Sequence, residues 1–432
     1  MCPVLAGLPR LPSPGVPWPK DLPVGGHFMN SKSIGDRLGE LRRYRDITQE
    51  ELAERSGVHV DTIRKLEQNV RQSARLGTLR KLARALDTEL DRLLGQPTVT
   101  TELPDDDGGL IALRDAIQDI SALPGVPADD LDEDPPAADD WMRQVRAATT
   151  LYWEGGYSEL AGSLPLLLRD GRAVAREATG SLADQVWNQL ALSYQLAASL
   201  ATQAGHVDWA FEAVAKQLQA AQRASDPLME GMGVSTLSWV QQGRWEEAQS
   251  VAERKADALE PSMRRGTSAQ YAVYGNLLVA AATPAARQDR KADADQYLNF
   301  AEAAAVRSGA VRTYGTAFSP VDVKTQIVNV VMAGSEPEPE KALEASEDVR
   351  RDLIKRPVHL AAHRLDVAQA QYQMGDSEGA LDTLLEVEAD QPEWIRYQML
   401  ARATVLEMRD EERRRNTRLR GLAARLGVEP AL

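Results

Sequence analysis

One segment of the chain, residues 60–68, places basic and polar side chains at helical spacing. Ile63 and Leu66 are three positions apart, so a helix here would turn both toward a core. The opposite face would then carry Val60, Asp61, Arg64 and Lys65. An arginine guanidinium can donate two hydrogen bonds to O6 and N7 of guanine. Arg64 is therefore the best candidate for direct contact with a nucleic-acid base.

The residues before this segment predict a second helix and a tight turn that position it. Thr48 and Glu51 have the spacing of a capping box, so a helix is expected to begin at Gln49. Leu52 lies on its inward face. Gly57 can take the positive φ that a sharp turn requires. The sequence thus predicts two short helices joined by a glycine turn.

Flanking apolar residues extend the pair into a small domain over residues 31–95. Ser33 is the expected N-cap of an earlier helix. The apolar stripe of that helix and its following turn holds Ile34, Leu38, Leu41 and Ile47. One or two later helices are indicated by Leu79, Leu82, Ala83, Leu86, Leu90, Leu93 and Leu94.

This order of features resembles the Xre/Cro/C1-type helix-turn-helix family of phage and bacterial repressors. The resemblance covers residues 31–95 and includes the cap, the glycine turn, Ile-x-x-Leu-Glu and Leu-x-x-Leu-Ala-x-Ala-Leu. It implies that Gln49 grips a DNA phosphate and that the helix from Val60 reads base edges. The implied DNA-binding residues are Gln49, Val60, Asp61, Thr62, Arg64, Lys65 and Arg71.

Two positions depart from the family pattern. Val60 is apolar where polar readers are common, so we expect it to contact a thymine methyl group. Asn69 stands where the family often has glycine, but asparagine tolerates the left-handed conformation. The family also has a structural ion pair between its first and its recognition helix, which here would join Arg42 to Glu67.

Charge is distributed unevenly along the chain. Residues 31–95 hold 14 Lys and Arg against 11 Asp and Glu, whereas the whole chain has a formal net charge of −14. Glu67 is the one acid among the basic residues Arg64, Lys65, Arg71, Arg75, Arg80, Lys81 and Arg84. Charge runs are usually ordinary solvated faces, but next to a helix-turn-helix pattern this one favours phosphate contacts.

The rest of the chain is predicted to be helical. Its 432 residues suggest roughly two to four structural units, and the composition has only 5% aromatic residues. No apolar run approaches the roughly 18 residues that cross a bilayer. The single cysteine, Cys2, excludes an internal disulfide framework. We expect a cytoplasmic protein without membrane contact.

Two segments are predicted to lack a packed core. Residues 1–30 form an expected disordered, proline-rich leader, in which Met29 is a candidate native start. The alternative is a flexible arm that contacts DNA, which offers only Arg10 and Lys20 as cations. Residues 96–140 are expected to be an acidic linker with one helix, which docks on a domain or, less favoured, pairs between subunits. That helix is indicated by Leu110, Ile111, Leu113, Ile117 and Ile120.

From residue 141 a weak internal repeat governs the fold prediction. A helix, a glycine, an acidic residue with alanine and a second helix recur at 156–161, 205–210, 243–248 and 375–380. Less regular copies lie around 271–308, with a charged insert at 287–291, and around 328–349. The region 141–390 resembles a tetratricopeptide-repeat superhelix, closed by capping helices over 391–432. The predicted fold class is all-α, a helix-turn-helix domain followed by an α-solenoid.

Stacked helix pairs line a concave groove that binds an extended peptide or another protein. The repeat register places ten side chains there, although for each one a solvated or inter-helix contact is the commoner alternative. The candidates are Arg143, Arg146, Thr150, Trp153, Gln195, Ser199, Thr202, Asn276, Gln369 and Tyr372.

Catalytic patterns give no support for an enzyme. His359 and His363 are four residues apart, as helical metal ligands are, but no third ligand is evident and two histidines with ordinary partners are the better interpretation. No phosphate-binding loop, nucleophile elbow or kinase motif occurs. We expect no catalytic activity, metal or cofactor.

The domain order resembles bacterial regulators of the Rgg/PlcR type. That resemblance implies a homodimer on a double-stranded DNA operator, whose geometry a peptide or small molecule in the groove controls. The alternative is a DNA-binding scaffold whose repeats dock a protein partner without a small ligand. A deep polar groove would favour the ligand, and an open, partly apolar groove would favour the protein partner.

Overall fold

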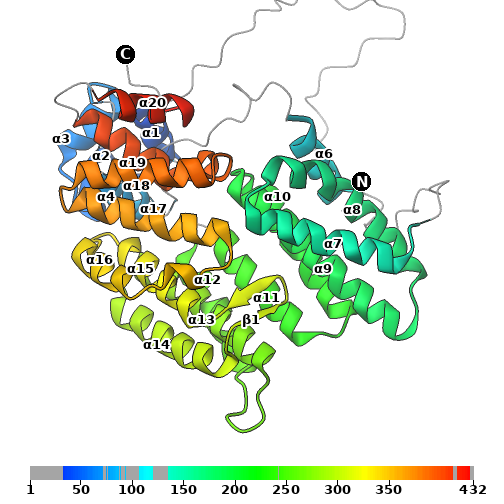
Figure 1. The fold of residues 1–432 in the computed structure, drawn as a ribbon. Helices are drawn as coiled ribbons and strands as arrows, with labels where there is room; N and C mark the ends of the chain where they lie inside the picture. The colour runs from blue at the N-terminus through cyan, green and yellow to red at the C-terminus, as the bar shows by residue number, and fades with distance from the viewer. Residues whose placement is uncertain are drawn as a thin grey trace, which may run out of the picture. The chain divides into compact units, whose positions relative to one another are not determined.

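The computed structural model describes residues 33–71, 74, 76–86, 88, 93, 107–119, 135–241, 243–411 and 416–428. Over these residues the chain is almost entirely helical, which confirms the all-α prediction (Figure 1). The predicted leader over 1–30 and most of the predicted linker over 96–140 lie outside the described residues. Among the helices described, none combines the length and the apolar character needed to cross a bilayer.

Among the described residues of the N-terminal domain, four helices are present: α1(Ile34–Tyr44), α2(Gln49–Ser56), α3(Val60–Glu67) and α4(Leu76–Ala85). Ser33 caps α1 and Thr48 caps α2, as predicted, and both caps are capping boxes, although the box was predicted only for Thr48. Gly57 has φ 66° and makes the turn into α3. The side chains of Leu38, Leu52, Ile63, Leu66 and Leu82 meet in one fully buried core.

Six helical hairpins follow over residues 138–390. They are α7(Ala138–Glu154) with α8(Tyr157–Glu177), α9(Gly180–Gln203) with α10(Val207–Arg223), α11(Pro227–Val240) with α12(Trp245–Ala258), α13(Ser268–Arg287) with α14(Lys291–Ser308), α15(Pro320–Ala333) with α16(Pro339–Glu347), and α17(Pro357–Gln373) with α18(Ser377–Asp390). The 3-10 helices η2(Arg351–Leu353) and η3(Trp394–Tyr397) lie between later elements, and α19(Met399–Asp410) and α20(Thr417–Arg425) end the described chain.

The hairpin turns correct the register predicted for the first repeat. Gly155, Gly205, Gly243 and Gly375 all have positive φ and lie two residues before the second helix of their pair. In the first pair the left-handed residue is therefore Gly155 and not Gly156. The residue five positions later, Leu160, is fully buried like its counterparts Ala210, Ala248 and Ala380. Because Gly155 and Gly156 are adjacent, the sequence left open which of them makes the turn. The burial of Leu160 identifies Gly155.

The charged insert predicted at 287–291 is the same turn in the fourth pair. Asp289 has φ 58° and takes the place of the glycine. Ala294, five residues on, is 2% exposed and matches the buried position of the other pairs. Aspartate tolerates the left-handed conformation through its short polar side chain, so no glycine marks this turn in the sequence.

A small β-hairpin between α14 and α15 was not indicated by the sequence patterns. Strands β1(Val311–Thr313) and β2(Thr316–Phe318) pair antiparallel with Val311 opposite Phe318. Phe318 is buried against α13 at Gly275, where an added Cβ would lie 2.1 Å from the phenylalanine ring. The hairpin thus fills a gap that only a glycine leaves open.

The helix expected within the linker is α6(Asp107–Ile117), and it docks on the repeat domain of its own chain. Leu110, Leu113 and Ile117 are buried in the core shared with α8, while Ile111 is 48% exposed. The Arg172 guanidinium of α8 donates to the Ala116 carbonyl at 3.0 Å. Ile120 lies outside the described residues.

Candidate nucleic-acid interface and repeat cavity

Helix α3 presents one exposed and one buried face, as its spacing predicts. Ile63 and Leu66 are fully buried. Asp61 and Lys65 are exposed, and the remaining predicted readers are half-buried, namely Val60, Thr62 and Arg64. The helix begins after His59, whose Nδ1 accepts the Asp61 backbone N–H at 3.3 Å.

The Arg64 guanidinium lies across the start of α3 and faces α2. Nη1 is 3.1 Å from Asp61 Oδ1, and Nη2 is 3.6 Å from Glu50 Oε1. All three side chains are at least 44% exposed. Exposed ion pairs contribute about 0–1 kcal/mol, so little free energy opposes the release of Arg64 toward another acceptor.

Glu67 holds the ion pair predicted from the family resemblance. Arg42 donates to both carboxylate oxygens, from Nε at 2.7 Å and from Nη2 at 2.9 Å. Gln49 Nε2 donates to the same carboxylate at 2.7 Å. Partial burial alone would raise the Glu67 pKa, but the hydrogen bonds from Arg42 and Gln49 hold it below the usual value. The carboxylate thereby ties α1, α2 and α3 together.

The turn after α3 is shaped as Asn69 allows. Asn69 has φ 56°, and its Nδ2 donates to Asp36 Oδ1 at 3.2 Å. Arg71, the next predicted DNA-contact residue, follows in this turn. Its backbone N–H donates to the Lys65 carbonyl oxygen at 2.9 Å. Its side chain is exposed.

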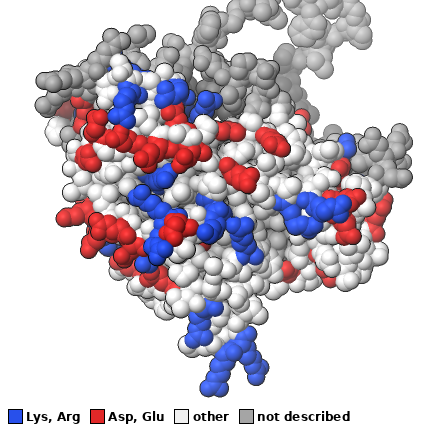
Figure 2. Space-filling view, viewed as in Figure 1, with Lys and Arg blue, Asp and Glu red and all other residues white. Residues whose placement is uncertain are grey.

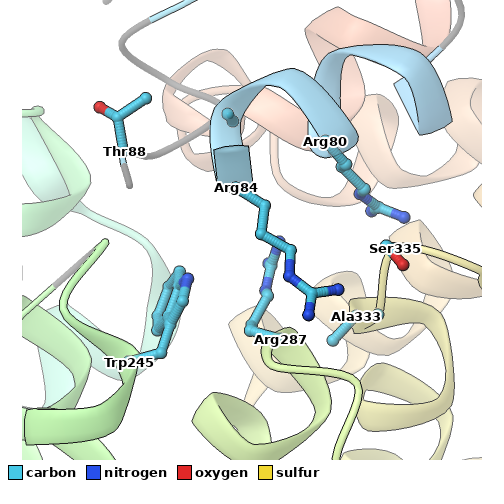
Figure 3. A pocket seen from close by; sticks show the side chains of 9 residues that line it. Arg80, Arg84, Thr88, Trp245, Arg287, Ala333 and Ser335 are labelled. Carbon is cyan, nitrogen blue, oxygen red and sulfur yellow. The ribbon is translucent and has the colours of Figure 1, made fainter. Parts of the chain in front are cut away.

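The later basic residues do not all face solvent, which corrects the charge prediction (Figure 3). Arg80 is 8% exposed and donates to the Met332 carbonyl at 2.9 Å. Lys81 lies 3.8 Å from Glu336, and Arg84 pairs with Asp289. Arg80, Lys81 and Arg84 form a basic edge of α4, and this edge packs on the repeat domain. Arg75 lies outside the described residues.

The repeat hairpins enclose a cavity of about 630 Å³. Its lining combines aromatic rings, side-chain amides and charged groups from α4, the hairpins and the segment 394–400. Three of the predicted groove residues contribute to it: Thr202, Asn276 and Gln369.

The other seven predicted groove residues lie outside this lining. Arg143, Arg146 and Thr150 are exposed on α7. Gln195 and Ser199 are buried between helices, where Gln195 Oε1 accepts Gln217 Nε2 at 3.0 Å. Trp153 lies under the guanidinium groups of Arg312 and Arg356, and Tyr372 donates to Glu411 at 3.1 Å. The regular repeat register overestimates the groove because the cavity is centred on α13, α15 and α17.

One polar face of α17 combines two histidines that were considered from the sequence as metal ligands with Gln369, which was predicted for the groove. His359, His363, Asp366 and Gln369 follow one another at spacings of four, three and three, and all line the cavity. His363 is 1% exposed, and neither ring nitrogen has a hydrogen-bond partner among the described residues. The expectation of ordinary partners is therefore wrong for His363. Burial lowers its pKa to about 4, so the ring is neutral.

Two further charged groups of the cavity, those of Arg356 and Asp366, were not predicted from the sequence. Arg356 donates to Asp322 at 3.3 Å and to the Ala317 carbonyl at 3.1 Å. Asp366 accepts two hydrogen bonds from Asn329 Nδ2, each at 3.2 Å. Burial raises the Asp366 pKa to about 7, against the opposing effects of Asn329, Arg80 and Arg287.

Capped α2, the Gly57 turn and the exposed face of α3 define a helix-turn-helix domain. The helix-turn-helix family model matches residues 38–93, which places this chain segment in that class. The match supports a DNA-binding transcriptional regulator with double-stranded DNA as a partner. Comparison with curated proteins and with solved structures finds no match to the chain.

Proposed function

We propose that the protein is a sequence-specific regulator whose α3 reads an operator and whose repeat domain senses a peptide or small molecule. The observation that carries the first part is the exposed α3 face, held by Gly57 and the Arg42–Glu67 pair inside the segment that the family model matches. In this proposal the sensing domain changes the geometry of a homodimer on paired half-sites.

Each exposed residue of α3 has a distinct role in the proposal. Arg64 and Lys65 donate to base edges, and Val60 contacts a thymine methyl group. Asp61 and Thr62 lie beside them at the start of the helix. Gln49 keeps one amide hydrogen on Glu67 and has a second one for a phosphate oxygen. Arg71 contacts the DNA backbone after the turn.

The cavity supports a ligand rather than a docked protein. Ligand pockets commonly have volumes of about 300–1,000 Å³ and combine apolar walls with a few converging polar groups. The cavity of about 630 Å³ has this composition, with Trp239, Trp245 and Trp394 beside Asn276 and Asn329. A protein partner would instead need an extended exposed surface.

Substitution of Arg64 tests the proposal in the full-length chain. Arg64→Ala should weaken binding to a selected operator by about 1–3 kcal/mol and relax selectivity at one base position. Arg254→Ala is the matched control, because Arg254 is exposed on α12 and donates a hydrogen bond to Ser250 on the same helix. Unchanged selectivity in competition binding with all four bases at each position would remove Arg64 from the reading surface.

A further inference from the structure

The cavity contains buried hydrogen-bond donors that no described residue satisfies. Beside the ring N–H of the neutral His363, they are Nε of Arg80, Nε of Arg287 and Nε2 of Gln369. Arg80 is 8% exposed and Gln369 is 1% exposed. Leaving a buried donor unpaired destabilises the protein, and more so when the group is charged. Three such donors at one site therefore indicate an acceptor that belongs there.

The three donors belong to one contiguous group. Arg80 Nη2 lies 3.5 Å from Gln369 Oε1, which turns the amide Nε2 away from Arg80. Arg287 is close enough to Arg80 to lower the pKa of Arg80, and both cations act to lower the pKa of Asp366. Figure 3 shows Arg80 and Arg84 on α4 above Arg287 of α13, at the small pocket that adjoins the cavity.

The charge of the lining favours a monoanion. It holds three arginines and two aspartates, and one pair, Arg356 with Asp322, is already matched. Burial, with the nearby Arg287, lowers the Arg80 pKa to about 9, so Arg80 stays charged at neutral pH. Asp366 has a pKa of about 7 and is partly protonated there. Glu407, outside the lining, also faces Arg80. Arg80 and Arg287, together with the partly ionised Asp366, thus leave a net charge between +1 and +2 in the lining. Glu407 reduces this positive charge.

We propose that the cavity binds an organic carboxylate, whose oxygens accept from Arg80 Nε, Arg287 Nε and Gln369 Nε2. Aromatic walls formed by Trp245, Trp394 and Phe318 give the rest of the molecule an apolar surface. The bound group is either a free organic acid or the C-terminus of a short peptide, since both present the same carboxylate. This inference rests on the proposed function for its link to DNA.

Arg80 makes the carboxylate a bridge between the two domains. It belongs to α4 of the helix-turn-helix domain, whereas Arg287 and Gln369 belong to α13 and α17. The full donor set exists only when α4 is docked on the repeats. A ligand that needs this set must stabilise the docked arrangement, because it binds that arrangement more tightly than any other.

Calorimetric titration of the full-length protein with 3-phenylpropionate tests the binding. We expect 3-phenylpropionamide, the neutral analogue, to bind at least about tenfold more weakly, because charge-assisted hydrogen bonds are lost. Inorganic phosphate is the third probe. The tripeptide alanyl-alanyl-phenylalanine, as free acid and as amide, separates the two sources of the carboxylate. Equal affinity for acid and amide in both pairs, or binding of phosphate alone, would overturn the proposal.

Two variants locate the site without altering α4. Arg287→Met keeps an unbranched side chain but removes the whole guanidinium, and Gln369→Glu keeps the shape but replaces a donor with a competing carboxylate. Both should reduce affinity for 3-phenylpropionate at least about tenfold, while Arg254→Met on exposed α12 should leave it unchanged. Wild-type affinity in both cavity variants would place the acid elsewhere.

Hydrogen exchange tests the bridge. 3-Phenylpropionate should slow amide exchange in residues 76–85 of the wild-type protein, and Arg80→Met should abolish this protection. Operator binding is measured on the same samples. Loss of the carboxylate effect with intact selective DNA binding would overturn this inference alone. Absence of selective DNA binding would overturn the proposed function, and the titration result would still decide whether the acid binds.

Discussion

The Glu67 carboxylate stabilises the helix that carries the proposed DNA readers. It accepts from Arg42 on α1 and from Gln49 on α2 while belonging to α3. A side chain in this position cannot itself contact a base, because its oxygens are occupied. The proposed readers are therefore its neighbours Arg64 and Lys65, which lie on the helix that this partly buried pair holds in place.

Glu67→Gln should lower stability near neutral pH by about 1–3 kcal/mol, since a charged hydrogen-bond acceptor is lost. The folded-state pKa of Glu67 lies below its ordinary value of 4.5, so its contribution is fully present above about pH 4.5. It is lost as the pH falls through the folded-state pKa. Urea unfolding at several pH values should show wild type and variant converging in acid. Glu54→Gln, exposed on α2, is the control, and a pH-independent difference would contradict this role.

Asp366 should show the opposite pH dependence. Burial raises its folded-state pKa to about 7, so its ionisation in the folded state opposes folding as the pH rises from about 4 through 7. Asp366→Asn should therefore be more stable than wild type at pH 8, by no more than about 4 kcal/mol, and the advantage should vanish near pH 4. Thermal unfolding across this range measures it. Parallel stability curves would show that Asp366 is not a buried titrating group.

At the scale of the elements, local signals decide the N-terminal domain. The Thr48 cap and the Gly57 turn could be predicted because each depends on a few neighbouring residues. The left-handed conformation of Asn69 was predicted for the same reason. The turn at Asp289 and the β-hairpin could not, since a non-glycine left-handed residue and a ring packed on Gly275 are decided by tertiary contacts.

The candidate sites were predictable to different degrees. The α3 face follows from helical spacing alone. The cavity required knowledge of which hairpins converge, so the repeat register found Thr202, Asn276 and Gln369 but not Arg287 or Asp366. The sequence also did not predict that α4 docks on the repeat domain through Arg80. A basic residue next to a DNA-binding helix is expected to face phosphates.

Arg172 tests whether α6 belongs to the repeat domain. It donates to the Ala116 carbonyl and pairs with Asp119 at the end of α6. Arg172→Met should increase amide exchange across residues 107–117 by about tenfold, in keeping with one charged hydrogen bond. Arg176→Met, exposed on the same helix, should leave exchange unchanged. Equal exchange in the Arg172 variant would mean that apolar packing of Leu113 and Ile117 suffices.

At the scale of the whole molecule, acidic residues are concentrated on one helix. Helix α18 carries five acidic residues and no basic one, and Figure 2 shows acidic side chains gathered in a band across this face. Four of these five carboxylates pair with arginines: Glu378 and Asp382 with Arg418, Glu388 with Arg425, and Asp390 with Arg364. The acidic charge of this face is therefore largely neutralised locally, and DNA contact is proposed for the helix-turn-helix domain because of the family match.

The most direct test of DNA reading by α3 is selection of bound sequences from random duplex DNA by the full-length protein. We predict an enriched two-fold symmetric motif with half-sites about one helical turn apart, 10–10.5 base pairs. Arg64→Ala should lose enrichment at one position of each half-site. Recovery of unenriched sequences by the wild-type protein would contradict the central claim.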